Sequence, residues 1–320
     1  MSMSRWHVGA FNTLAVICLL IVEPVAVKAG LLETNFHSCS GGTADLDRLI
    51  ASCTWLMDFD LSEEDAAMAH NNRGAGYFLK SQYDRAIRDF DEAIRLNPDY
   101  AEPYNGRGNV YSDKGQHVRA ITEFDEAIRL KADYADAHNG RGSAYRNRGQ
   151  FDRAIRDFDE ALRLKPNYVF AYNNRGNAYS GKGEFDRAIR DFAEAIRLKP
   201  DEAVHYNGRA VAYRKTGRYD RAIRDYDRAI HLKSDEASAY TNRGNAYLNQ
   251  GEYDQAIRDH DDAIRLQPDF AGGYNNRGVV YLNKRQFDRA IEDFDEAIRL
   301  ETDFSEAIQN RALAFQRKGQ

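Results

Sequence analysis

The sequence is poor in proline, cysteine and tryptophan, with 6, 3 and 2 residues among 320. So few prolines favour long helices joined by short turns. An excess of one charge is also missing, because 45 Lys and Arg residues face 50 Asp and Glu residues, for a net charge of −5. This balance argues against nucleic acid as a partner. The apolar content of 42% is sufficient for a hydrophobic core and excludes a disordered chain.

The sequence also lacks a hydrophobic run that could span a bilayer, which needs about 20 residues. The uninterrupted run Leu14–Val22 has nine residues. It follows Arg5 and precedes Val27-Lys28-Ala29, a pattern typical of a secretory signal peptide cleaved after Ala29. We therefore predict that residues 1–29 are a signal peptide and that the mature chain is exported, to the periplasm or otherwise secreted, without stable membrane insertion. An uncleaved membrane anchor is the alternative.

Removal of the signal peptide would take Cys18 away and leave Cys39 and Cys53 as an even pair. A disulfide between them would persist outside the cytoplasm. Two buried thiols or a metal site are the alternatives, although a lone cysteine pair without a nearby pair of histidines does not favour a metal.

From residue 67 onward the sequence repeats with a period of 34 residues. The repeat is marked by Asn-x-Arg, and its arginines are Arg73, Arg107, Arg141, Arg175, Arg209, Arg243, Arg277 and Arg311. Apolar residues recur at helical spacing in both halves of a unit, so each unit is predicted to be two amphipathic helices. We predict seven repeats over residues 67–304, a degenerate N-terminal capping repeat over 30–66 and a C-terminal capping helix over 305–320.

The residues of each unit carry a family resemblance. The pattern is Tyr172-x2-Arg175-Gly176-x2-Tyr179, then Ala188-x3-Phe192 and Pro200. It resembles the tetratricopeptide repeat over residues 67–320. The resemblance implies an all-α fold, a right-handed α-solenoid of helix-turn-helix repeats, with the first helix of each repeat on its concave face.

The sequence departs from this family at one position, because the family usually has Leu where the eight units have Arg. A guanidinium at a normally apolar position needs a partner. An acid follows sixteen residues later in each full unit, at Asp89, Glu123, Asp157, Asp191, Asp225, Asp259 and Asp293. We predict a ladder of arginine–carboxylate pairs that connects the repeats. The alternative is that these arginines line a ligand groove.

Asparagine recurs on the predicted first helices at two neighbouring positions. A carboxamide can donate to and accept from an extended peptide backbone. The predicted peptide-binding groove therefore comprises Asn71, Asn105, Asn139, Asn173, Asn174, Asn207, Asn242, Asn275 and Asn276. It is similar to the asparagine ladder of O-linked N-acetylglucosamine transferases, although no transferase domain follows. The alternative is that these asparagines bond neighbouring helices.

Motifs for catalysis, metals and cofactors are absent from the sequence. It has no phosphate-binding glycine loop, nucleophile elbow or His-Glu-x-x-His. Recurring carboxylates such as Asp159 are interpreted as a solvated helix face. The sequence thus predicts no enzyme, no cofactor and no metal, but a scaffold that binds a protein or peptide partner and could form a homo-oligomer. The alternatives are a self-associating envelope spacer and a glycan-binding solenoid.

Overall fold

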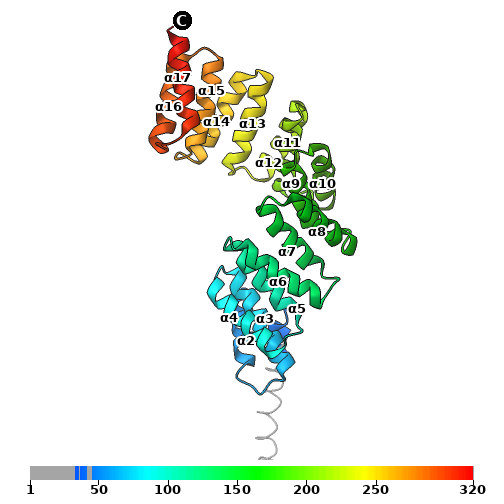
Figure 1. Cartoon of the computed structure of the whole chain (residues 1–320). Coiled ribbons are helices and arrows are strands. Elements are labelled where there is room, and N and C mark those ends of the chain that lie inside the picture. Colours follow the sequence, from blue (N-terminus) through cyan, green and yellow to red (C-terminus); the bar gives the residue numbers. More distant parts are fainter. Residues whose placement is uncertain (1–32, 36, 42–44, 320) are drawn as a thin grey trace, which may run out of the picture. The chain divides into compact units, whose positions relative to one another are not determined.

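The computed structural model describes residues 33–35, 37–41 and 45–319, so the predicted signal peptide lies outside the described residues. Within these ranges every regular element is a helix, which confirms the all-α prediction (Figure 1). The chain divides into two compact units, which we call unit 1, up to Ala144, and unit 2, from Tyr145 onward.

The helices follow the 34-residue period of the sequence. Unit 1 contains α2 (Leu46–Leu56), α3 (Glu63–Leu79), α4 (Tyr83–Leu96), α5 (Ala101–Asp113), α6 (His117–Leu130) and most of α7 (Ala135–Asn147). Unit 2 continues with α8 (Phe151–Leu164), α9 (Val169–Gly181), α10 (Phe185–Leu198), α11 (Ala203–Lys215), α12 (Tyr219–Leu232), α13 (Ala237–Gln250), α14 (Tyr253–Leu266), α15 (Ala271–Asn283), α16 (Phe287–Leu300) and α17 (Ser305–Lys318). From α3 on, odd-numbered helices are the first helices of the repeats and even-numbered helices are the second. Consecutive helices pack together from α2 to α6 in unit 1 and from α8 to α17 in unit 2, and neighbouring first helices also touch, as α3 does α5 and α9 does α11.

The turns between the helices follow from the sequence. Gly115 and Gly149 follow first helices with φ of +72° and +70°, a conformation that glycine adopts without a steric penalty. At the other end of a helix, the Ser62 Oγ accepts a hydrogen bond from the Asp65 backbone N–H at 3.1 Å. This N-cap starts α3 at Glu63, before the repeat boundary predicted at residue 67.

One aromatic side chain of each second helix fills the space between first helices. Phe90 of α4 packs against Gly74 of α3 and Gly106 of α5. A Cβ atom at Gly106 would lie 2.5 Å from the Phe90 Cζ, so the close approach requires glycine. The equivalent buried residues are Phe124, Phe158, Phe192, Tyr226, His260 and Phe294. The core is thus a row of contacts between neighbouring repeats, as expected for a solenoid.

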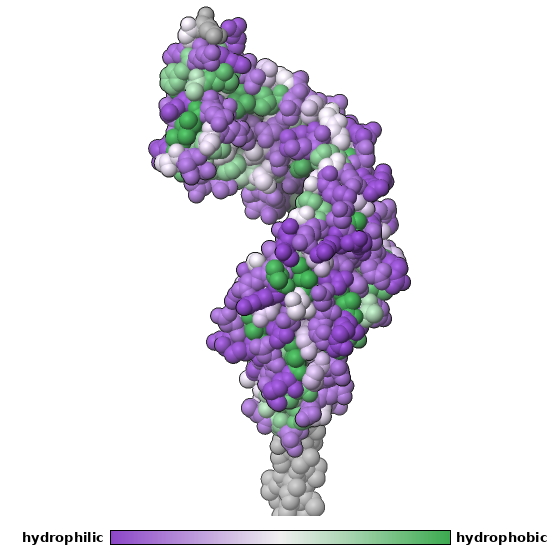
Figure 2. All heavy atoms as spheres, viewed as in Figure 1, coloured by the Kyte–Doolittle hydropathy of each residue, from purple (hydrophilic) through white to green (hydrophobic). Residues whose placement is uncertain are grey.

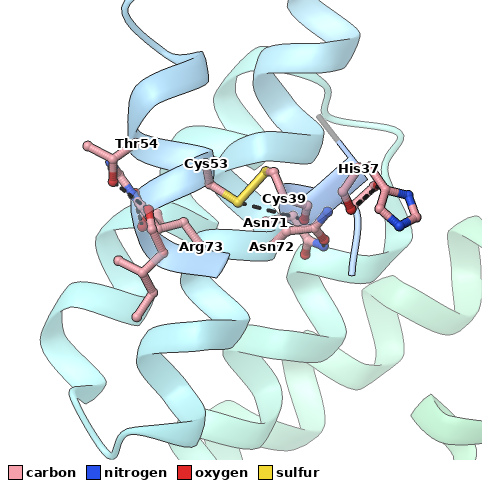
Figure 3. Close-up of a disulfide and its surroundings, with 10 residues drawn as sticks. His37, Cys39, Cys53, Thr54, Asn71, Asn72 and Arg73 are labelled. Atoms are coloured by element: carbon pink, nitrogen blue, oxygen red, sulfur yellow. Dashed lines mark hydrogen bonds and ion pairs between the residues drawn. A yellow bond between two sulfur atoms is a disulfide. The ribbon is translucent and has the colours of Figure 1, made fainter. Parts of the chain in front are cut away.

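The predicted N-terminal cap is built around the two cysteines. Cys39 and Cys53 are joined by a disulfide, which lies beside the first turns of the repeat array (Figure 3). Both are buried with Leu56 and with Ala69 of α3, so the disulfide belongs to the core that covers the first repeat.

Reduction of this disulfide is expected to loosen the N-terminal end before the rest of the array. Closing a loop of this length stabilises the chain by about 3 kcal/mol in the chain-entropy model. Trp55 of α2 packs on Phe59, with ring centroids 4.4 Å apart, and so reports on the cap. In the presence of reductant, we expect the urea unfolding transition seen by Trp55 emission to have a lower midpoint than the transition seen by helical circular dichroism. The protein used is residues 30–320, in which Trp55 is the only tryptophan. An emission transition insensitive to reductant would contradict this role of the disulfide.

The last helix covers the end of unit 2. Ala307 and Ala314 of α17 are buried, and Gln309 and Lys318 are exposed. However, Ile308 and Phe315 are also exposed. At the repeat position of Phe315, Tyr179 of α9 packs against the core around Phe192 of α10.

Candidate functional site

An arginine at one repeat position of the first helices can join three helices. In α9, the Arg175 Nε and Nη2 donate to the two carboxylate oxygens of Asp191 in α10, at 2.8 and 2.7 Å. Its Nη1 donates to Asp159 in α8 at 2.6 Å. Arg175 therefore connects its own second helix to the second helix of the preceding repeat.

The same geometry recurs along both units. The pairs with the acid sixteen residues later are Arg73–Asp89, Arg107–Glu123, Arg175–Asp191, Arg209–Asp225, Arg243–Asp259 and Arg277–Asp293. The pairs with an acid sixteen residues earlier are Arg107–Asp91, Arg141–Asp125, Arg175–Asp159, Arg243–Asp227, Arg277–Asp261 and Arg311–Asp295. The sequence interpretation missed this second set. Asp159 and its equivalents are not simply solvated, and the available signal was the recurrence of Asp two residues after the first acid.

Burial and ion pairing shift the pKa values of these arginines and acids in opposite directions. Burial disfavours the charged guanidinium of Arg175, but the hydrogen bonds and charges of Asp191 and Asp159 outweigh it and raise the pKa of Arg175. Burial raises the pKa of Asp191 in spite of Arg175. Because these arginines are neutralised by carboxylates of their own chain, the geometry favours a structural role over a ligand groove.

One repeat lacks the carboxylate that would connect it to the preceding repeat. Arg209 of α11 binds Asp225 at 2.7 and 2.8 Å, but the position that corresponds to Asp159 is Ala193 in α10. We expect Ala193→Asp to raise the free energy of unfolding by about 0.5 kcal/mol, the typical value for a half-exposed ion pair. Urea unfolding of A193D beside A193N tests this. An equal gain in A193N would show that charge is not the cause.

The predicted groove asparagines fall into several environments. Some bond within or between first helices. Asn71 donates to Asn72 at 3.0 Å, His205 of α11 bonds the Asn173 Oδ1 at 3.1 Å, and Asn174 accepts from Arg146 at 3.3 Å. Asn139 also has a partner within the chain. These bonds fit the alternative in which asparagines join neighbouring helices.

Asn275 is a correction to the predicted groove. Its side chain is 1% exposed, and its Oδ1 accepts from Asn310 of α17 at 3.0 Å. A residue enclosed between α15 and α17 cannot contact a peptide on the surface. The Oδ1 atoms of Asn105 and Asn207 are also buried, and no described residue bonds them.

Asn242 of α13 and Asn276 of α15 remain as candidates. Both are half-buried, and neither carboxamide has a hydrogen-bond partner among the described residues. Asn177 of α9 and Asn245 of α13 share these properties and were missed by the sequence interpretation. Helical spacing in the sequence could have identified them, because Asn177 lies three residues after Asn174 and Asn245 lies three residues after Asn242.

These four asparagines lie on one side of the first helices. Residues spaced by three, four, seven and ten share a helix face. We use the name first-helix face of unit 2 for the row formed by Arg146, Phe170, Asn177, Ser180, Val204, Arg214, Lys215, Asn242, Asn245 and Asn276. Figure 2 shows that hydrophilic residues dominate the visible surface, with smaller hydrophobic areas among them.

The described residues contain no group of His, Cys, Asp and Glu that could hold a metal ion. No helix in the described ranges has the length and hydrophobicity to cross a membrane.

Comparison with known proteins supports the repeat assignment. A family model described as a TPR repeat matches residues 74–115, 108–146, 142–183 and 210–251. A second, described as the tetratricopeptide repeat, matches residues 169–202, 237–270 and 271–304. A search of curated proteins found no similar sequence.

Solved structures show the same fold at low sequence identity. The APC/C hetero-tetramer Cut9–Hcn1 aligns with a TM-score of 0.66 at 18% identity, over 85% of this chain and 53% of that one. This chain thus spans about half the length of that protein. A tetratricopeptide repeat protein from Parabacteroides merdae gives 0.60 at 19% identity, over 78% and 98%. The pilF protein of Pseudomonas aeruginosa gives 0.58 at 18% identity, over 65% and 95%.

Proposed function

The chain belongs to the tetratricopeptide repeat family, and on that premise we propose that it is a non-catalytic scaffold that holds an extended segment of a partner protein. The segment lies on the first-helix face of unit 2. The observation that carries this proposal is the set of four half-buried carboxamides without an internal partner, Asn177, Asn242, Asn245 and Asn276. A carboxamide offers both a donor and an acceptor, as a peptide unit does. Such a row can bind a main chain with little demand on its side chains.

The proposal places the mature chain in the periplasm. Two features support an oxidising compartment outside the cytoplasm. The first is the signal-like pattern of residues 1–29, and the second is the disulfide between Cys39 and Cys53.

The test is a selection of random twelve-residue peptides displayed on phage against the immobilised chain. The parent is compared with a variant that carries Asn177→Ala, Asn242→Ala, Asn245→Ala and Asn276→Ala. A matched control replaces two exposed amides of the turns between repeats, Asn167 and Gln267, with alanine. Circular dichroism verifies that all three proteins are equally helical.

We expect peptides enriched on the parent and on the turn control to lose at least about tenfold of their enrichment on the fourfold variant, equivalent to about 1.4 kcal/mol of binding free energy. Equal enrichment on all three proteins would move the binding site away from these asparagines. If no peptide is enriched and the chain sediments as an oligomer, the self-associating alternative is favoured, with the exposed Ile308 and Phe315 as its contact.

A further inference from the structure

The first-helix face of unit 2 carries two arginines that no carboxylate of the described residues neutralises. Arg146 of α7 donates to the amide oxygens of Asn174 and Asn147, at 3.3 and 3.1 Å. The buried Nε of Arg214 in α11 has no hydrogen-bond acceptor in the described part of the chain, and the group that the Arg214 guanidinium approaches is the neutral hydroxyl of Tyr226. Neither forms an ion pair there, whereas the arginines at the Arg175 position do. Burying a charge without a counter-charge is unfavourable, so both sites would gain from an anion.

Ser180 stands at the same repeat position as these two arginines, on the first helix between theirs in the sequence. Arg146, Ser180 and Arg214 occupy the same repeat position, 34 residues apart, on the first helices α7, α9 and α11. The Ser180 Oγ is buried and has no hydrogen-bond partner among the described residues. A hydroxyl and two guanidinium groups at one repeat position of successive first helices offer the donors that the acceptor oxygens of a carboxylate need. Lys215, next to Arg214, adds an exposed cation at the same end of α11.

The first helices nearest to these arginines carry no opposing charge on this face, whereas Asp136 of α7 and Glu306 of α17 stand at its two borders, at the repeat position of Phe170. The equivalent positions of α9, α11, α13 and α15 hold no Asp or Glu. In unit 1 the same positions carry Glu102, Asp113 and Asp136. The face of unit 2 is therefore positive within a chain whose net charge is −5, so the sign of its charge does not follow from overall composition.

The N-terminal ends of α9 and α11 are apolar on this face, whereas Ser180 and Arg214 lie near the C-terminal ends. Phe170 of α9 and Val204 of α11 occupy one repeat position and are 65% and 51% exposed. Ten residues separate Phe170 from Ser180, which corresponds to about 15 Å along a helix. An extended peptide covers that distance with four to five residues.

We propose that the partner segment is an acidic peptide, with one apolar residue on Phe170 and Val204 and a carboxylate four or five residues away on Arg146, Ser180 and Arg214. This inference rests on the proposed function and specifies its ligand. Asn177, which lies between Phe170 and Ser180 on α9, would hold the main chain of this stretch, and Asn242, Asn245 and Asn276 would hold the part of the segment that continues over α13 and α15.

The peptides selected on the full chain test this inference through their composition and salt dependence. One variant carries Arg146→Gln, Arg214→Gln and Lys215→Gln, and a second carries Phe170→Ser and Val204→Ser. The matched control for charge replaces three exposed arginines of the second helix α10 with glutamine, at Arg187, Arg190 and Arg197. An enriched peptide is then synthesised and its affinity measured by fluorescence anisotropy at 50 and 300 mM NaCl, beside a version with Asp and Glu replaced by Asn and Gln.

We expect peptides enriched on the parent and the α10 control to combine Asp or Glu with one apolar residue four or five positions away. The triple glutamine variant should bind the acidic peptide at least about tenfold more weakly, with little remaining salt dependence. The double serine variant should lose the apolar preference but keep the salt dependence.

Two other outcomes would separate a failure of this inference from a failure of the scaffold proposal. Enriched peptides without acidic residues, or equal binding to the triple glutamine variant and the control, would overturn this inference and leave the scaffold proposal intact. The absence of any enriched peptide would overturn both.

Discussion

Arg175→Leu is expected to lower the free energy of unfolding by about 3 kcal/mol at pH 7, near the lower end of the cost of breaking a buried ion pair. Leucine restores the apolar residue usual in the family, but it leaves the Asp191 carboxylate buried without its bidentate donor. It also removes the link to Asp159 in the preceding repeat. Urea unfolding followed by far-UV circular dichroism measures the change.

The cost should depend on pH in a defined direction. Burial already raises the pKa of Asp191 with Arg175 present, and without the guanidinium that pKa rises further. The folded R175L protein binds a proton at Asp191 at a higher pH than the unfolded chain does, so the penalty of R175L is full above the raised pKa and shrinks as pH falls through it toward the unfolded pKa.

Two further variants identify the cause. R175L/D191A removes both charges and should recover a large part of the loss. R187L, which removes an exposed arginine of α10 paired with Glu184, should cost less than about 0.5 kcal/mol. A similar loss in R187L and R175L would contradict the role of the arginine column.

His260→Phe is expected to stabilise unit 2, more strongly in acid than at neutral pH. His260 of α14 is fully buried where other second helices have Phe or Tyr, and neither ring nitrogen has a partner in the described residues. Removing these unsatisfied groups should gain about 2 kcal/mol at pH 7. The gain is measured from urea unfolding of H260F and the parent at pH 7 and pH 5.

The acid component follows from the pKa of His260. Burial, with a smaller effect of Arg277, lowers it from 6.5 to about 4. Below pH 6.5 the unfolded chain binds a proton that the folded chain does not, so the parent loses stability as pH falls from 6.5 toward 4. At pH 5 this loss is about 2 kcal/mol, and H260F should abolish it.

The control for this experiment is the exposed His231 of α12, replaced by glutamine in H231Q. That variant should keep the acid sensitivity of the parent. His205 of α11 is also buried with a lowered pKa, so H260F should retain part of the acid sensitivity. An unchanged pH dependence in H260F would show that His260 is not its source.

The candidate site was only partly predictable. Helical spacing placed asparagines on the first helices, but the same carboxamide can face a ligand or a neighbouring helix. Asn275 accepts a hydrogen bond from Asn310 and is enclosed, whereas Asn276, one residue later, is half-buried and has no hydrogen-bond partner in the described part of the chain. A rotation of 100° about the helix axis separates these outcomes, and a sequence period does not state where the next helix lies.

The sequence by itself determined the repeat length, the helix pairs, the glycine turns and the need of each buried arginine for an acid, because these depend on local spacing and on the energetics of single groups. Only the tertiary structure decided that the arginines reach a second acid in the preceding repeat. It also decided which asparagines are enclosed between repeats and that Arg146 and Arg214 have no counter-charge among the residues that the structure describes. Those outcomes depend on the packing of one repeat against the next, which side-chain periodicity within a repeat does not encode.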